Sequence, residues 1–113
     1  MAIIVDLVRG WQSAGGDVVF TRYLNYADSP FERLIGWTEM VDGLEIELVA
    51  ELVPFVCPRT PVVDKYIYTL FTPEGAQLVA ERGWTDLYVC GIDTDICVLK
   101  TAVDAFERNL TPR

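Results

Sequence analysis

The stretch Leu87–Phe106, LYVCGIDTDICVLKTAVDAF, decides the fold of this chain. Its first four residues are apolar and predict a short buried strand over Leu87–Cys90. Gly91 then predicts a tight turn, and apolar residues at helical spacing predict a helix from about Thr94 to about Asn109. The side chains that we expect this helix to bury are Leu99, Ala102, Val103 and Phe106. The stretch is thus predicted to be a strand, a turn and a helix in succession.

Cys97 stands near the start of that helix. A helix N-terminus presents unpaired N–H groups and a partial positive charge, and a thiol placed there ionises more readily and becomes a nucleophile. The position just past the carboxyl end of a parallel strand is also where α/β folds bind ligands. Cysteines without such a placement usually only pack, so we interpret Cys57 and Cys90 as core thiols. Cys97 is therefore the candidate nucleophile.

The rest of the chain predicts helices and strands in alternation. We expect, in order, a helix over Ala2–Gln12, a strand over Asp17–Arg22, a long folded loop over Tyr23–Gly43, a short helix over Leu44–Leu52, a strand over Val62–Lys65 and a helix from Pro73 to Arg82. Thr72 as the N-cap, Pro73 at the first helical position and Gly83 at the end mark the last of these helices. Strands that alternate with helices imply a parallel sheet in an α/β layer fold.

The first segment allows two interpretations. Ile3, Ile4, Leu7, Val8 and Trp11 recur at helical spacing, whereas the first apolar run is also suitable for a strand. A strand here would leave about eight residues before the next strand, and a parallel crossover needs about 10–12. We therefore favour the helix.

Composition excludes several classes of function. The formal charge of −8 argues against nucleic acid, which attracts clusters of Lys and Arg. No apolar run approaches the roughly 20 residues of a membrane helix, and no signal peptide is visible, so we expect a cytoplasmic protein with no membrane partner. Three cysteines without metal-site spacing fit reduced thiols. The absence of His removes Ser-His-Asp and Cys-His catalysis.

Three motifs resemble one known family, the isochorismatase-like (nicotinamidase-like) cysteine hydrolases. They are GIDTDICV (residues 91–98) followed by TAVDA (101–105), KYIYTLF (65–71) and VVFTR (18–22). The matches come in family order and cover nearly the whole chain. The resemblance implies a three-layer α/β/α fold with a mostly parallel sheet.

The resemblance also assigns roles to residues. Cys97 would attack a small amide or a related carbon and form a thioester that water then cleaves. Lys65 would stabilise the thiolate and the developing negative charge, and the N–H groups of Asp93 and Cys97 would form the oxyanion hole. In this family the peptide that corresponds to Ile92–Asp93 is commonly cis.

The chain also departs from the family pattern. The family's general base is an aspartate at the end of the first sheet strand, and this strand is missing if Ala2–Gln12 is a helix. Asp6 is the alternative base if that segment is a strand. Family members also continue beyond the last helix, so we expect residues 1–113 to be a partial, incomplete domain that is truncated at both ends. The rival to a working hydrolase is therefore a catalytically inactive remnant that acts as an interaction or assembly module.

The loop after Arg22 bears on the substrate and on metal. Arg22, Tyr23 and Trp37 are candidates to line a pocket for a small aromatic or carboxylated ligand, although each could simply pack the loop down. Some nicotinamidases of the family bind a metal through Asp and His residues here, and this loop has no His. We therefore expect no metal and no cofactor. We expect a small-molecule substrate, and a homo-oligomer because family members are often dimers or tetramers.

Overall fold

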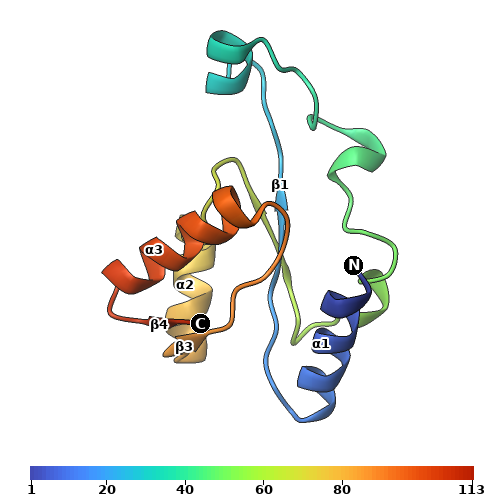
Figure 1. Ribbon diagram of the computed structural model, residues 1–113, viewed down its shortest axis with the longest axis vertical. Helices are drawn as coiled ribbons and strands as arrows, with labels where there is room; N and C mark the ends of the chain where they lie inside the picture. Colours follow the sequence, from blue (N-terminus) through green and yellow to red (C-terminus); the bar gives the residue numbers. More distant parts are fainter. The chain divides into compact units, whose positions relative to one another are not determined.

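The computed structural model describes residues 1–113 and divides them into two compact units, Met1–Tyr66 and Ile67–Arg113. The first unit contains α1 (Ala2–Ser13), β1 (Phe20–Tyr23), η1 (Phe31–Ile35), η2 (Gly43–Ile46), η3 (Val53–Phe55) and β2 (Val62–Lys65) (Figure 1). The second contains α2 (Pro73–Arg82), β3 (Asp86–Leu87), η4 (Thr94–Val98), α3 (Leu99–Glu107) and β4 (Thr111–Pro112). No helix of the chain has both the length and the apolar character to cross a lipid bilayer.

The first unit is organised around a parallel pair of strands. β1 and β2 pair in register from Phe20 opposite Val62 to Tyr23 opposite Lys65. The prediction for β2 is confirmed, whereas β1 begins three residues later than predicted. The reason is that the backbone at Asp17 is bonded elsewhere, because its carbonyl accepts the Trp11 indole N–H at 2.9 Å.

The first segment is a helix, as favoured from its spacing. α1 packs Val8 against Phe20 and Leu52, which form the core of this unit. Asp6 lies exposed on α1 and accepts a bond from Arg9 at 3.0 Å. The alternative in which Asp6 ends a strand is therefore wrong.

The helix predicted over Leu44–Leu52 is also wrong. Only the short turn η2 forms there, and it stops at Glu47, whose ψ of 150° is extended. Leu48 and Leu52 reach the core next to α1, while Leu44 is 91% exposed. The chain is extended at Glu47, so the three leucines do not share a helix face although their spacing is helical.

The second unit starts with the helix that carries the clearest end signals. The Thr72 side chain accepts the Gly75 N–H at 3.0 Å, Pro73 opens α2, and Gly83 ends it with φ +65°. The prediction for α2 is therefore confirmed at both ends.

The strand predicted over Leu87–Cys90 is largely wrong, because β3 (Asp86–Leu87) shares only Leu87 with it. β3 pairs in parallel with β4 over two residues only, and one further bond joins the Val89 N–H to the Arg113 carbonyl at 3.1 Å. All strand pairs of the chain are thus parallel, and together with the helices they make the fold α/β, as predicted.

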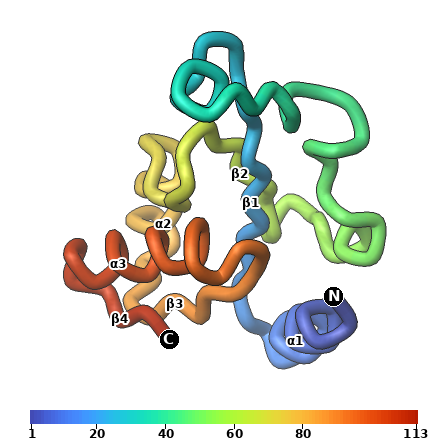
Figure 2. The backbone as a smooth tube through the Cα atoms, turned by 45° about the horizontal axis from the view of Figure 1, so that its top comes forward, coloured from blue at the N-terminus to red at the C-terminus, as the bar shows by residue number.

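The helical run η4–α3 begins after Asp93, close to the predicted start. In Figure 2 the coil labelled α3 lies in the orange-to-red, C-terminal part of the chain. It buries Thr101 and Ala105, whereas Leu99, Val103 and Phe106 are exposed, so the predicted buried face is wrong. The predicted Ala102 is half-buried. The face of α3 that carries the small side chains Thr101 and Ala105 is buried because the segments at Leu70 and Leu110 pack against it. The Thr101 hydroxyl accepts the Leu70 N–H at 3.1 Å, and the Ala105 carbonyl accepts the Leu110 N–H at 2.9 Å.

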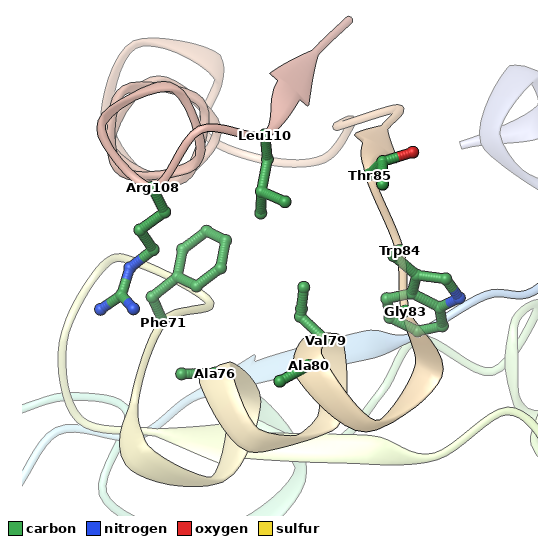
Figure 3. Close-up of a pocket in the computed structure, with 9 residues that line it drawn as sticks. All are labelled: Phe71, Ala76, Val79, Ala80, Gly83, Trp84, Thr85, Arg108 and Leu110. Atoms are coloured by element: carbon green, nitrogen blue, oxygen red, sulfur yellow. The ribbon is translucent and has the colours of Figure 1, made fainter.

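A hollow of about 340 Å³ lies in this unit between α2 and the end of α3 (Figure 3). Phe71, Val79 and Leu110 line it with apolar side chains. The Arg108 guanidinium lies 4.7 Å from the centroid of the Phe71 ring and flanks the hollow.

Candidate active site

Lys65 is a buried cation at the carboxyl end of β2. Its side chain shares the buried face of the strand with Val63, because alternate residues of a strand point to the same side. The residue is only 3% exposed, and its ammonium lies 5.8 Å from the centroid of the Tyr23 ring. Tyr23 is the register partner of Lys65, so the parallel pairing of β1 and β2 sets this contact.

A line of aromatic rings continues from Tyr23 into the loop that follows β1. The Tyr23 and Phe31 rings meet edge to face with centroids 6.0 Å apart, and the Phe31 and Trp37 rings do so at 5.0 Å. The structure therefore brings together three of the residues expected or proposed for the site, namely Lys65, Tyr23 and Trp37. We call Tyr23, Phe31 and Trp37 the aromatic line.

The loop that carries the aromatic line is held together by Asn25. This side chain is 2% exposed and donates to the carbonyls of Trp37 at 3.2 Å and Glu39 at 3.1 Å. Its own carbonyl accepts the hydroxyl of the fully buried Ser29 at 2.6 Å. The expectation of a folded loop is thus confirmed. The sequence analysis missed Asn25, and the only local signal for it is a short amide side chain in a long loop.

Arg22 does not join the other predicted pocket residues. It precedes Tyr23 on β1 and so points to the opposite face of the strand. Its guanidinium forms a bidentate ion pair with the Asp64 carboxylate, with hydrogen bonds of 2.7 and 2.9 Å. It also donates a hydrogen bond of 3.1 Å to Glu47. The hydrogen bond with Asp64 raises the pKa of Arg22, and the same bond lowers the pKa of Asp64. Arg22 is therefore occupied by carboxylates of its own chain.

Cys97 lies in the second unit, half-buried within η4. The Asp93 carbonyl accepts hydrogen bonds from the N–H groups of Ile96 at 3.3 Å and Val98 at 3.2 Å. It does not accept one from the N–H of Cys97. The Ile92–Asp93 peptide is cis, as the resemblance implied. Gly91, with φ +149°, provides the turn that leads into this segment, a conformation that side-chain-bearing residues rarely adopt.

The other two thiols are not core residues, so that interpretation was wrong. Cys57 is exposed at a turn that it closes with Thr60, since Pro58 cannot continue a strand. A hydrogen bond with the Thr60 side chain lowers the pKa of Cys57, and the backbone N–H groups and the charge of Arg59 add to this effect. Cys90 is also exposed, because it lies beyond the two-residue ladder of β3, although partial burial of its thiol raises its pKa.

The chain offers few groups that could hold a metal ion. No three side chains among Cys, Asp and Glu gather at one place, and the sequence has no His. The expectation of a metal-free site remains a prediction.

Comparison with known proteins gives one consistent result. The family model described as the isochorismatase domain matches residues 1–113. N-carbamoylsarcosine amidase from Thermoplasma acidophilum is 25% identical, with a TM-score of 0.84, over 96% of this chain and 62% of that chain. Nicotinamidase PncA from Bacillus subtilis is 29% identical, also with a TM-score of 0.84, over 98% of this chain and 65% of that one.

A third structure agrees in fold alone. A cysteine hydrolase from Pseudomonas syringae pv. phaseolicola 1448A is 20% identical, with a TM-score of 0.83, over 96% of this chain and 54% of that chain. No curated protein matches the chain. The chain thus spans somewhat less than two thirds of the length of the amidase and the nicotinamidase.

Proposed function

This chain belongs to the isochorismatase family, and we propose that it hydrolyses a small amide or a related substrate through Cys97. The observation that carries the proposal is the placement of Cys97 in the first turn of the η4–α3 helical run, directly after the turn at Gly91. Two similar structures are named as amidases, which supports an amide as the substrate class.

The proposed reaction has two halves. The Cys97 sulfur attacks the amide carbon and forms a C–S bond while the carbonyl electrons move to oxygen, and the N–H groups of Asp93 and Cys97 stabilise that oxyanion. Collapse breaks the C–N bond, and the leaving nitrogen takes up the proton that the thiol released. Water then attacks the thioester, which releases the carboxylic acid and restores the thiol.

Lys65 is the second residue of the proposal. A buried ammonium at a strand end suits a group that stabilises a thiolate and a developing negative charge. The family resemblance assigns Lys65 to the same reaction as Cys97.

The aromatic line suggests what the substrate looks like. The Tyr23 ring lies next to Lys65 and continues through Phe31 to Trp37, whereas Arg22 is already paired with Asp64. We propose that the rings bind a planar or aromatic amide, and that Arg22 does not bind a substrate carboxylate.

We further propose that the enzyme acts in the cytoplasm without a metal or a cofactor.

The proton carrier limits the expected rate. In the family an aspartate moves the proton between thiol and leaving group, and Asp6 does not have that position because it is paired with Arg9 on the surface of α1. In this proposal water carries the proton. General acid–base catalysis contributes about 10²–10⁴-fold, so turnover is expected to be slower by about this factor than with a positioned aspartate.

Mass spectrometry of trapped acyl-enzyme tests the proposal directly. Incubation with activated esters and aromatic amides should add one acyl group to Cys97, and Cys97→Ser should remove it. Cys57→Ser is the matched control, because Cys57 is an exposed thiol with a lowered pKa and is also expected to react with simple alkylating reagents.

Two results separate the alternatives. Loss of ammonia release in Cys97→Ser, with release retained in Cys57→Ser, supports the hydrolase. If Cys97 is alkylated as slowly as Cys90 and no amide is turned over, the chain is the catalytically inactive remnant.

A further inference from the structure

Thr101 is the first buried residue that follows Cys97 in the helical run η4–α3. No residue of η4 is buried, and in α3 only Thr101 and Ala105 are. Cys97 itself is half-buried, whereas residues 92–96 before it are exposed. Within the run, the first point that the rest of the unit covers is therefore Thr101, four residues after the candidate nucleophile.

Cys97 and Thr101 lie on the same side of the run. At 3.6 residues per turn, a spacing of four residues places the two side chains within about 40° of each other around the helix axis. Asp104, seven residues after Cys97, lies within about 20° of it by the same count. A contact that sets the rotation of the helix at Thr101 therefore also sets the direction in which the Cys97 side chain points.

Hydrogen bonds from one segment hold this side of the helix. The Thr101 hydroxyl accepts the buried Leu70 N–H at 3.1 Å, and the two residues are 7% and 6% exposed. The neighbouring Thr69 hydroxyl accepts the Phe71 N–H at 3.1 Å, and the Thr69 side chain is also hydrogen-bonded to the Asp104 carboxylate. A buried N–H that loses its acceptor has no water to replace it. The position of the helix thus depends on the acceptor that Thr101 provides.

We propose that Thr101 is a positioning residue for Cys97. Its hydroxyl fixes the rotation of the helical run about its own axis and, through this rotation, the direction of the Cys97 sulfur. An atom about 5 Å from a helix axis moves by about 2 Å when the helix turns by about 20°. A displacement of about 1 Å can cost about 10²-fold in rate, because attack needs aligned reacting atoms. The inference rests on the proposed function, in which Cys97 is the nucleophile.

Two replacements of Thr101 separate its hydroxyl from its bulk. Thr101→Val has nearly the same shape but no acceptor for the Leu70 N–H, whereas Thr101→Ser keeps the acceptor. Thr101→Val should lower kcat by about 10²-fold and change KM by less than about threefold, because it affects attack rather than binding. Thr101→Ser should keep kcat within about fivefold of the unaltered chain. Thr111→Val is the matched control, since it makes the same replacement at an exposed threonine of the same unit, and it should leave kcat unchanged.

A fluorine label reports the direction of the Cys97 sulfur without the need for turnover. With Cys57→Ser and Cys90→Ser in the background, bromotrifluoroacetone labels Cys97 alone, and fluorine NMR reads the surroundings of the label. Thr101→Val should shift or broaden the resonance, whereas Thr101→Ser and Thr111→Val should leave it in place. A role of Thr101 in stability alone would not change the resonance of the folded protein.

Circular dichroism confirms that each variant is folded. If Thr101→Val does not fold, Thr69→Val takes its place, because it removes a hydroxyl from the same segment and leaves Thr101 intact, and it should change kcat and the resonance in the same direction.

An unchanged fluorine resonance in the folded valine variant would overturn the proposal, whatever the rate. An unchanged kcat despite a shifted resonance would also overturn it, and so would equal effects of Thr101→Val and Thr101→Ser, because the hydroxyl would then not be the cause. If the unaltered chain turns over no amide, the proposed function fails, and the label still decides whether Thr101 sets the direction of Cys97.

Discussion

Replacing Asn25 by Ala removes the side chain that ties the two ends of the loop carrying the aromatic line. The Asn25 amide makes three hydrogen bonds, to the carbonyls of Trp37 and Glu39 and from the Ser29 hydroxyl. The backbone bond from the Asn25 N–H to the Met40 carbonyl, at 2.7 Å, remains in the variant. The effect therefore measures the side chain alone.

The expected loss follows from these three bonds. Each contributes about 1 kcal/mol net, and the Ser29 hydroxyl is left buried without its acceptor, so Asn25→Ala should cost about 3 kcal/mol of folding free energy. Ser29→Ala loses the shared bond and also the acceptor for the Glu32 N–H, a cost of about 2 kcal/mol. Because the two residues share one bond, the double variant should fall short of the sum by about 1 kcal/mol.

Urea denaturation followed by tryptophan fluorescence measures this loss. With a slope of about 1.5 kcal/mol per molar, the midpoint of Asn25→Ala should fall by about 2 M. Thr38→Ala is the control, because Thr38 is exposed in the same loop and its replacement should change stability by less than about 0.5 kcal/mol. If Asn25→Ala and Thr38→Ala have the same midpoint, Asn25 does not organise the loop and this reasoning is refuted.

Two further predictions concern charge and close packing. The hydrogen bond with Arg22 lowers the pKa of Asp64 below its ordinary 3.8, so Asp64 contributes stability above that value and loses it as the pH falls through its folded-state pKa. Asp64→Asn should therefore make the loss of stability below about pH 4 less steep in acid titrations followed by circular dichroism, and an unchanged slope would count against the pair. Gly75→Ala should destabilise the chain, because the added Cβ would collide with the Leu70 carbonyl oxygen, whereas Gly10→Ala has open space in α1 and should stabilise it by up to about 1 kcal/mol in thermal melts. Equal melting temperatures for both glycine variants would contradict this contrast.

The candidate site shows how far residue patterns reach. Lys65 could be placed at the end of β2 because the strand is short, apolar and terminated by charge, and its burial follows from strand alternation. Cys97 could be placed just after a turn because Gly91 precedes it. The separation of Arg22 from Tyr23 also follows from alternation, but only once β1 is known to extend to Tyr23, one residue beyond its predicted end.

The thiols show where patterns fail. The burial frequency of cysteine suggested packing for Cys57 and Cys90, yet both lie at the surface. Their exposure depends on where the neighbouring ladders stop, and ladder length depends on a partner strand distant in the chain. The same cause limits β3 to Asp86 and Leu87, so that only Leu87 of the strand predicted over Leu87–Cys90 is paired.

By itself, the sequence determined those elements whose first and last residues are local capping signals. α2 needs only Thr72 to accept an orphan N–H, Pro73 to preset the first turn and Gly83 to leave it, and all three act within a few residues. Tertiary structure alone decided which side of α3 is buried, because apolar periodicity marks a stripe without saying what covers it. The loop before α2 and the connection to β4 close over the small residues Thr101 and Ala105, which allow the backbone to approach, and the larger side chains are left outside.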